Sequence, residues 1–379
     1  MNSLLLVCNL HPKKFGTFER YLIEMGRVCR DRAIRFGLML SGEPIPMVAD
    51  ELRKVGAVWT AVSDWNDARD RERRGRFLRA YLNVLKSGSW DVVVFQFCTE
   101  ISVSLASGLA RSLGRSPKAT IWVQHSQMVM PGRMARWASR MRILRRAIDR
   151  MILLSEAGRS AVVARGWPAE RTIVVRNGIP LGIEPRRGWL RKELGLPDDA
   201  VVLVSIGSLI PRKGYDILLP ALAPLLSTAQ TRHLLILGEG PDRAALAVLV
   251  NSLGIASRVH FLGLRNDAGD VLADSDLFVL ASRAEGLTLA VVEALAASLP
   301  VVVTAVGGHA ELVTEDIGIV VPPGEGERFR EGVRMLLDDL PKARRMGADG
   351  RKRVEQSYSL ETQIHEQLSY FATGSGVKP

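Results

Sequence analysis

Short runs of apolar, β-favouring residues alternate along the whole chain with longer stretches of helical character. The runs are Leu4–Cys8, Ile34–Leu40, Val92–Phe97, Thr120–Gln124 and Met151–Leu154 in the first half, and Val201–Ile206, His233–Leu237, Val259–Leu262, Leu277–Leu280, Val301–Thr304 and Gly318–Val321 in the second. Most are continuously apolar, as strands are when helices cover both faces of a parallel sheet. The pattern therefore predicts the α/β class with doubly wound parallel sheets.

Length and turn residues predict two Rossmann-like domains. A chain of 379 residues exceeds what one hydrophobic core usually supports. Turn residues cluster at Asn177–Pro180, where we place a hinge. We expect an N-terminal domain over residues 1–180 and a C-terminal domain over 181–356, with a helix at about 357–372 packing back on the first. Two such domains facing across a cleft would bind ligands at the carboxyl ends of their strands.

Composition limits the class of protein. Apolar residues make up 47% of the chain and charged residues 24%, which is typical of a globular protein without extensive disorder. Cys8, Cys29 and Cys98 are too few and too scattered for a disulfide framework or a zinc cluster, so we expect buried thiols in a reducing compartment. No apolar run approaches the roughly 20 residues of a membrane span, and no signal peptide is recognisable. We expect a cytoplasmic protein.

The positive charge is concentrated in the first half. Residues 1–180 hold 30 Lys and Arg against 15 Asp and Glu, whereas the remainder holds 21 against 25. Arginines recur at Arg133, Arg136, Arg140, Arg142, Arg145, Arg146 and Arg150, interleaved at helical spacing with Met134, Trp137, Met141, Leu144 and Ile148. A second cluster comprises Arg69, Arg71, Arg73, Arg74, Arg76 and Arg79, with Asp70 and Glu72 among them. A basic amphipathic helix over Arg133–Arg150 can lie on an anionic membrane surface, and the alternative is a surface helix packed on its own domain.

Two carboxylates bracket a predicted strand–loop–helix junction in the second half. The strand Leu277–Leu280 is followed by a loop that ends at Gly286, and we expect a helix to begin near Leu287 or Thr288. A helix that begins at the carboxyl end of a strand presents free amides and a positive dipole end, which suit a diphosphate. Glu293, within the helix, can accept hydrogen bonds from ribose hydroxyls, and Glu285 can reach the sugar beyond. The alternative is a solvated Glu293 and a helix-capping Glu285.

The residues of this junction resemble a known signature. The segment Glu285–Ala296 (EGLTLAVVEALA) is similar to the Glu-x7-Glu motif of glycosyltransferase family 4, and Leu299–Thr304 and Val306–Val313 resemble the segments that follow it there. Ser298 stands where that family usually has glycine, so we expect a small packing change. The resemblance implies the GT-B fold, retention at the anomeric carbon, and donor contacts from Gly286, Leu287, Thr288, Leu289 and Glu293, with Glu285 among the catalytic residues.

Three further segments of the second half resemble the same family. Val204–Gly214 (VSIGSLIPRKG) is similar to its strand–turn with a Lys-Gly pair, which implies that Lys213 neutralises the departing diphosphate with help from Arg212. Many relatives carry arginine at the position of Ser208, so part of the usual phosphate clamp is missing here. Leu235–Pro241 and Val259–Gly263 resemble segments near the nucleotide, which adds Gly240 and Gly263 to the donor site. Taken singly, these residues are equally typical of ordinary surface turns.

The first half resembles the family more loosely. Phe15–Arg20 occupies the place of a glycine-rich loop after the first strand, so the resemblance implies donor contacts from Gly16 and Thr17. Trp122–Ser126 ends a strand where relatives place a histidine that faces the donor sugar, which implies a catalytic His125. A lone histidine at the end of a strand is otherwise more often structural.

These observations predict a retaining glycosyltransferase. It would move a sugar from a UDP- or GDP-sugar to a glycan or lipid-linked acceptor in cell-envelope or exopolysaccharide biosynthesis, without a metal or other cofactor. We expect no nucleic acid partner, and we expect the protein to be cytoplasmic or bound to the inner face of the cell membrane. A nicotinamide-dependent oxidoreductase is disfavoured because no strand is followed by a convincing Gly-x-Gly-x-x-Gly. A sugar-nucleotide epimerase and a non-catalytic nucleotide-sugar-binding protein remain as alternatives.

Overall fold

The chain forms two compact units. The computed structural model describes residues 1–12, 16–63, 70–125, 144–182 and 188–374. Unit 1 comprises residues 1–176 and 360–379, and unit 2 comprises residues 177–359. The predicted boundary at residues 180 and 181 lies four residues beyond this division.

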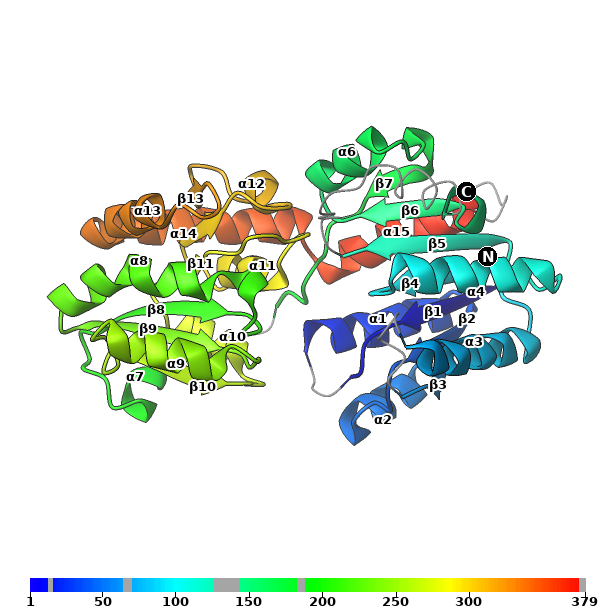
Figure 1. The fold of residues 1–379 in the computed structure, drawn as a ribbon, viewed down its shortest axis with the longest axis horizontal. Helices are drawn as coiled ribbons and strands as arrows, with labels where there is room; N and C mark the ends of the chain where they lie inside the picture. Colours follow the sequence, from blue (N-terminus) through cyan, green and yellow to red (C-terminus); the bar gives the residue numbers. More distant parts are fainter. Residues whose placement is uncertain (13–15, 64–69, 126–143, 183–187, 375–379) are drawn as a thin grey trace. The chain divides into compact units, whose positions relative to one another are not determined.

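Unit 1 is built on a parallel sheet with the strand order β3-β2-β1-β4-β5-β6-β7. Its described strands are β1 (Ser3–Cys8), β2 (Arg35–Leu40), β3 (Val58–Ala61), β4 (Val92–Gln96), β5 (Ala119–Gln124), β6 (Arg150–Leu153) and β7 (Thr172–Val174). Its described helices are α1 (Thr17–Asp31), α2 (Pro46–Lys54), α3 (Arg71–Lys86), α4 (Glu100–Ser112), α6 (Glu156–Ala164), the short η1 (Ala169–Arg171) and α15 (Leu360–Gly374). The central strands are apolar on both faces because helices cover both, as in Figure 1.

Unit 2 is built on a second parallel sheet with the order β10-β9-β8-β11-β12-β13. Its strands are β8 (Val201–Ile206), β9 (Arg232–Leu237), β10 (Val259–Gly263), β11 (Leu277–Leu280), β12 (Val301–Thr304) and β13 (Gly318–Val321). Its helices are α7 (Leu190–Glu193), η2 (Pro211–Lys213), α8 (Tyr215–Thr228), α9 (Arg243–Ser252), α10 (Ala268–Ala273), α11 (Leu289–Ala296), α12 (His309–Leu312), α13 (Gly326–Asp338) and α14 (Leu340–Ser357). Leucine and valine side chains from β8, β9, α8 and α13 form its main core.

All the predicted strands are present, and the first sheet has one additional strand at each of its two edges. The additional strands are β3, on one edge, and β7, on the other. The residues of β3 are partly or fully exposed, and β7 is only three residues long. Edge strands need no continuous apolar run, because they pair on one side only and are less deeply covered.

The helix that follows unit 2 in the sequence packs into unit 1. Ile364, Leu368 and Phe371 of α15 are buried, and α15 contacts α1 and β5 (Figure 1). The Tyr21 hydroxyl of α1 donates a 2.7 Å hydrogen bond to Gln367 Oε1 of α15. The sequence placed this helix at about 357–372, and the structure places it at Leu360–Gly374.

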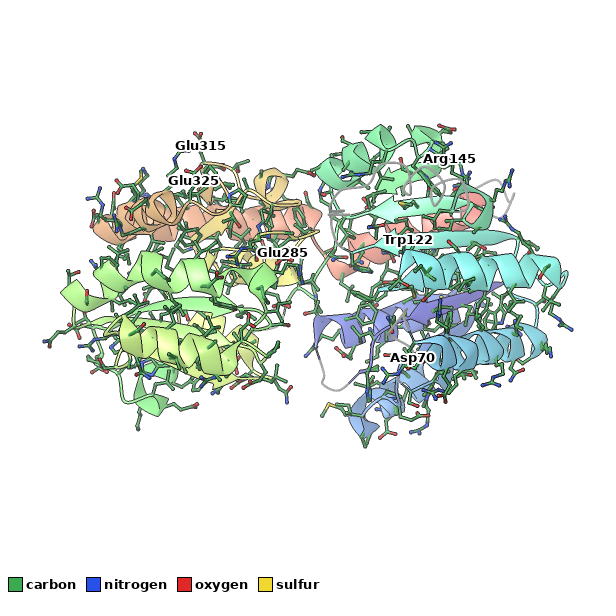
Figure 2. All side chains as sticks on the ribbon, in the orientation of Figure 1. Asp70, Trp122, Arg145, Glu285, Glu315 and Glu325 are labelled. Carbon is green, nitrogen blue, oxygen red and sulfur yellow. The ribbon has the colours of Figure 1, made fainter. Side chains whose placement is uncertain are left out.

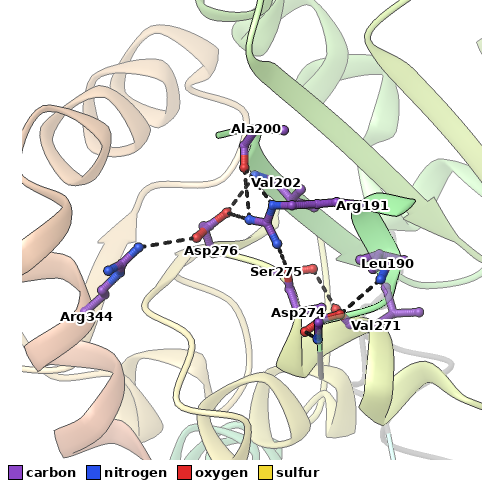
Figure 3. Close-up of polar contacts among 10 residues, drawn as sticks. Leu190, Arg191, Ala200, Val202, Val271, Asp274, Ser275, Asp276 and Arg344 are labelled. Atoms are coloured by element: carbon purple, nitrogen blue, oxygen red, sulfur yellow. Dashed lines mark hydrogen bonds and ion pairs between the residues drawn. The ribbon is translucent and has the colours of Figure 1, made fainter. Parts of the chain in front are cut away.

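A charged network closes the amino edge of the second sheet (Figure 3). The Asp274 carboxylate accepts from the amides of Gly188, Trp189 and Leu190 at 2.6 to 3.1 Å. Arg191 donates to the Asp276 carboxylate at 2.7 Å and to backbone carbonyls. Burial acts to raise the pKa of Asp274, but the three amides together with the charge of Arg191 outweigh it, and the pKa lies below its ordinary value. This network fixes the segment before β8 to the sheet, at the edge opposite the strands' carboxyl ends.

Cys8, Cys29 and Cys98 are buried free thiols, as predicted. Across the described ranges, the helices are each too short or too polar to cross a bilayer.

Candidate functional site

The second sheet has a topological switch point between β8 and β11. From β8 the chain proceeds outward to β9 and β10, and it then returns to β11 on the other side of β8. The loops that follow β8 and β11 therefore begin side by side at the carboxyl edge of the sheet and lead away in opposite directions. In open parallel sheets such a point is where ligands bind. The residues predicted for diphosphate binding come from these two loops.

A glycine permits the two loops to touch. Gly214 follows η2 and has a left-handed backbone with φ of 70°. A Cβ atom at this position would lie 2.0 Å from the Ala281 carbonyl oxygen, so only glycine fits without a backbone shift. The Arg283 amide donates to the Arg212 carbonyl at 2.8 Å, which joins the loops again. The Lys-Gly pair is thus explained by a close backbone approach.

The contact between the loops builds a cluster of two cations around one carboxylate. Glu285 Oε1 lies 2.7 Å from Lys213 Nζ and accepts from the Ser282 hydroxyl at 2.8 Å. Glu285 Oε2 accepts from Arg212 Nη1, also at 2.8 Å. Glu285 is 5% exposed and Lys213 7% exposed, whereas Arg212 extends to the surface. Figure 2 labels Glu285 in unit 2. The three predicted residues therefore lie together and carry a net charge of one positive unit.

Burial and charge act against each other in this cluster. Burial acts to raise the pKa of Glu285, but Lys213, Arg212 and the Ser282 hydroxyl outweigh it, so the pKa lies below its ordinary value. Burial lowers the pKa of Lys213 from its ordinary 10.5, against the opposing effect of Glu285. A carboxylate and an ammonium in direct contact stabilise each other's charged form. Glu285 and Lys213 are therefore an ion pair at neutral pH.

The helix next to the cluster begins two residues later than the earlier of its predicted starts. Helix α11 begins at Leu289, and Thr288 is its N-cap residue without a side-chain capping bond. Its first amides still face the carboxyl edge of the sheet, as predicted for a phosphate site. Gly286 accepts at its carbonyl from the Gly308 amide at 2.6 Å, and Leu287 is buried.

A histidine that the sequence did not single out holds Thr288. His309 is fully buried, with Nδ1 3.0 Å from the Thr304 carbonyl and Nε2 2.9 Å from Thr288 Oγ1. Burial lowers the pKa of His309 below its ordinary 6.5, so the ring is neutral. A carbonyl can only accept, so Nδ1 carries the proton and Nε2 accepts from the Thr288 hydroxyl. Thr304 also donates to the Ser282 carbonyl at 2.6 Å, which completes a buried brace beneath the Glu285 loop.

The other predicted donor residues of unit 2 lie along the same edge. Glu293 is a partly exposed residue of α11. Gly240 packs against backbone, because a Cβ there would lie 2.2 Å from the Leu209 carbonyl oxygen. Gly263 ends β10 with φ of 67°. Ser208, at the position where arginine was expected from the family, is exposed.

Ser298 shows why a glycine would suit its position. It follows the end of α11 and has a left-handed φ of 64°, a conformation that side chains other than glycine's disfavour. Its carbonyl oxygen would lie 2.0 Å from a Cβ at Gly347, so the backbone here is tightly packed. The departure from the family at Ser298 is therefore a matter of helix termination.

In unit 1, Gly16 and Thr17 lie where the first loop meets a helix. Gly16 is the N-cap of α1 and Thr17 its first residue. The Glu19 carboxylate accepts from the Gly16 amide at 3.0 Å and is itself 3% exposed. The loop follows β1, which neighbours β4 at the switch point of the first sheet.

His125 follows β5 and is held on two sides. Its Nε2 lies 3.2 Å from Gln96 Oε1, and its ring stacks on Phe97 with centroids 3.8 Å apart. Gln96 Nε2 donates to the Tyr21 hydroxyl at 2.8 Å, which links the histidine through α1 to α15. Phe97 has a left-handed φ of 55°, which is rare for a bulky residue and marks a constrained position. Burial lowers the pKa of His125 to about 3, so the ring is neutral at physiological pH.

Most of the predicted membrane helix lies outside the described residues. Residues 126–143 are among those not described, and so is Arg69 of the second basic cluster. At the described end, Leu144, Ala147 and Ile148 are buried in the core of unit 1. At the start of α3, the N-cap residue Asp70 pairs with Arg73, and Glu72 pairs with Arg76.

Within the described ranges, His, Cys, Asp and Glu side chains do not gather in any group of three or more that could hold a metal ion. Metal independence stays a prediction.

The family-model match lies within unit 2. Residues 187–353 match the family model described as Glycosyl transferases group 1. The GDP-mannose-dependent monoacylated alpha-(1-6)-phosphatidylinositol monomannoside mannosyltransferase of Corynebacterium glutamicum is 34% identical over 180 residues, covering 45% of this chain and 47% of that protein. The lipopolysaccharide glucosyltransferase WaaG of Escherichia coli K12 is 32% identical over 176 residues, covering 43% and 47%. This chain spans about half the length of the curated relatives it matches.

Structural comparisons extend over both units. Anabaena HepE in complex with UDP-glucose superposes with a TM-score of 0.78 at 23% identity, covering 97% of this chain and 99% of that one. Sucrose-phosphate synthase from Thermosynechococcus elongatus gives a TM-score of 0.79 at 19% identity, covering 98% of each. The predicted fold class, two Rossmann-like doubly wound domains, is confirmed.

Proposed function

We propose that the protein is a retaining glycosyltransferase, because residues 187–353 match the family model described as Glycosyl transferases group 1. It transfers a sugar from a UDP- or GDP-sugar to a glycan or a lipid-linked acceptor in cell-envelope or exopolysaccharide biosynthesis. The observation that carries the proposal is the cluster of Lys213, Arg212 and Glu285 at the switch point of the family-matching unit. Relatives named as mannosyltransferase and lipopolysaccharide glucosyltransferase support the donor and acceptor classes.

In the proposed reaction the bond between the anomeric carbon and the diphosphate oxygen breaks, and its electron pair stays on the diphosphate. Lys213, Arg212 and the first amides of α11 stabilise that charge, which is the role that preorganised donors fill in many transferases. The acceptor hydroxyl attacks on the face that the diphosphate leaves, and its proton passes to the departing phosphate oxygen. We propose that these two side-chain cations take the place of a metal, so that the reaction proceeds without a metal or other cofactor.

The remaining predicted residues have proposed roles in holding the donor. Glu293 accepts hydrogen bonds from the ribose hydroxyls, and Glu285 contacts the sugar. Gly240 and Gly263 let the chain pass close to the nucleotide. For Gly16, Thr17 and His125 of unit 1, a contact with the donor stays a prediction of the family resemblance.

We assign the acceptor to unit 1 because its charge is strongly positive. Lipid-linked and phosphorylated acceptors are anionic, and a basic surface raises their local concentration. Leu144 and Ile148 are buried in the core of unit 1, so we propose that the segment Arg133–Arg150 meets the inner face of the cell membrane through its arginines. Liposome co-sedimentation tests this: binding to vesicles that contain anionic lipid, and none to neutral vesicles, is expected. Equal binding to both, or none to either, would remove the membrane from the proposal.

A panel of nucleotide sugars tests the enzymatic proposal. The true donor binds the folded state and therefore raises the melting temperature in a thermal-shift assay. The stabilising donor is then incubated with and without acceptor glycans, and release of the nucleoside diphosphate is measured. Transfer to an acceptor supports the proposal, interconversion of the donor sugar indicates an epimerase, and binding without any turnover indicates a non-catalytic binding protein.

A further inference from the structure

Glu285 is paired with both of the cations that the proposed reaction requires. Both of its carboxylate oxygens are used within the protein, one on Lys213 and Ser282 and the other on Arg212, all within 2.8 Å. Because Lys213 is itself buried, its ammonium has little water to exchange for another partner. A diphosphate that enters the site must therefore compete with Glu285 for both cations.

Resting on the proposed function, we infer that Glu285 is a counter-ion which the diphosphate displaces, and that it makes the site favour the sugar donor over the nucleoside diphosphate product. When the cations turn to the phosphates, the Glu285 carboxylate loses two charged partners. Of the contacts described above, the Ser282 hydroxyl remains. A buried carboxylate with one hydrogen bond is unfavourable, so the displacement opposes binding.

The sugar of the donor relieves that penalty. Its hydroxyl groups are hydrogen-bond donors, and an ionised carboxylate only accepts, so a hydroxyl placed at Glu285 replaces a lost cation. The free nucleoside diphosphate has no such group. It also carries one more negative charge than the donor, which would otherwise make the cationic site hold the product more tightly. Glu285 therefore counteracts retention of the product.

The neighbouring pair of Asp216 and Arg283 provides a matched control. The Arg283 guanidinium donates to both Asp216 carboxylate oxygens at 2.6 and 2.7 Å, and both side chains are largely exposed. Asp216→Asn removes one negative charge near the same loops, as Glu285→Gln does. Unlike Glu285→Gln, Asp216→Asn leaves the ion pairs of Glu285 with Lys213 and Arg212 intact.

Isothermal titration with UDP, GDP, UDP-glucose and GDP-mannose, all at the same pH, tests the inference. We expect Glu285→Gln to bind the cognate diphosphate at least ten times more tightly than the wild type, on the order of one unscreened charge contact. Affinity for the corresponding sugar donor changes by less than about threefold, because the donor loses a hydroxyl contact as it gains the cations. Asp216→Asn changes either affinity by less than about twofold.

The outcomes separate the two proposals. Diphosphate binding that is unchanged or weaker in Glu285→Gln overturns the inference while leaving the transferase standing. Absence of binding by the wild type for every nucleotide overturns both. If Glu285→Gln does not fold, carbon-13 NMR of the wild type replaces it: the Glu285 carboxyl resonance must move on addition of the diphosphate and move back toward its free position with the donor. A resonance that stays in place with both ligands contradicts the inference.

Discussion

At the scale of single residues, the site in unit 2 depends on charges held in poorly solvated positions. Burial lowers the pKa of Lys213 while the adjacent Glu285 opposes that effect, and burial lowers the pKa of His309 because it disfavours the imidazolium. Each residue is fixed by specific partners at hydrogen-bond distance. The chemistry and the pH response of the protein therefore trace to individual side chains.

Replacing Lys213 with alanine removes the buried cation from the leaving-group site. Loss of one preorganised electrostatic contact costs about 10² to 10³ in rate, so we expect the turnover number for transfer to fall by that factor. Circular dichroism should show a folded protein, because the core of unit 2 is unchanged. Lys352→Ala, which removes an exposed lysine of α14, is the control and should retain full activity. Wild-type turnover from Lys213→Ala would place the donor site elsewhere.

Replacing Glu293 with alanine should weaken donor binding with a smaller effect on the turnover number. Hydrogen bonds from sugar hydroxyls to a carboxylate contribute roughly 1.5 to 3 kcal/mol each, which corresponds to about tenfold or more in the dissociation constant. Titration calorimetry with the donor and with its 2′-deoxyribose analogue measures the effect. If the loss is equally large for both ligands, Glu293 does not bind that hydroxyl.

His309 should make unit 2 less stable in mild acid. Its pKa is below 6.5 in the folded state and close to 6.5 in the unfolded chain, so below pH 6.5 the unfolded state binds the extra proton. The free energy of unfolding therefore decreases as the pH is lowered below 6.5, by up to about 1.4 kcal/mol per pH unit for this one group. Urea unfolding at pH 7.5 and 5.5 measures it. His309→Asn should show a shallower decline than the wild type, and an identical decline would exclude His309 as its source.

At the scale of elements, the site exists because two strand-to-helix connections approach within backbone contact. The connection after β8 carries Lys213, and the connection after β11 carries Glu285. Gly214, between η2 and α8, is where they meet. Glycine is required there for two independent reasons, the left-handed backbone and the missing Cβ.

Two glycine-to-alanine substitutions separate these reasons. Gly195→Ala places a Cβ in open space at φ of 62°, so it introduces backbone strain alone, about 1 to 2 kcal/mol. Gly214→Ala adds a clash with the Ala281 carbonyl and should destabilise unit 2 further, as well as reducing transfer by displacing Lys213. Chemical denaturation and transfer assays on both variants measure the difference. Equal destabilisation and equal activity would mean that the loops can separate without consequence.

How much the sequence could predict differs from element to element. The strands β8, β11, β12 and β13 begin and end at the predicted residues, because burial on both faces makes their residues mostly apolar. The edge strands β3 and β7 escaped prediction because a strand that pairs on one side can be short and partly exposed. Lys213 and Glu285 were predicted separately, but their ion pair depends on how β8 and β11 pair and was not foreseeable from spacing. His309 belongs to no spacing pattern, and its role appears only once Thr288 and Thr304 are placed around it.

At the scale of the whole molecule, unit 1 is built from two stretches of the chain that unit 2 separates in the sequence. Unit 1 takes its last helix, α15, from beyond unit 2. The helix contributes buried Ile364, Leu368 and Phe371, and its Gln367 ends the hydrogen-bond chain that begins at His125. Unit 1 therefore depends on residues distant in sequence for both its core and its candidate histidine.

A chain that ends at Ser359 tests this dependence. Each lost apolar side chain contributes roughly 1.5 to 3 kcal/mol on burial, so the stability of unit 1 should fall by on the order of 5 kcal/mol or more. Hydrogen exchange, followed separately for β1 to β7 and for β8 to β13, should show faster exchange in the first set alone. A chain that ends at Gly374 serves as the control. Unchanged protection of the first sheet in the shorter chain would show that α15 contributes little to its stability.

The late position of α15 also has a consequence for biosynthesis. Every residue of unit 2 is synthesised after β7 and before α15. Because a ribosome adds about 5 to 20 residues per second, this interval lasts roughly ten seconds or longer. The nascent second sheet can reach its final form while the first still exposes the apolar side chains of β5 and α1 that α15 will cover. Slow translation or a shortage of chaperones should therefore cause aggregation through the N-terminal part of the polypeptide, even though that part leaves the exit tunnel first.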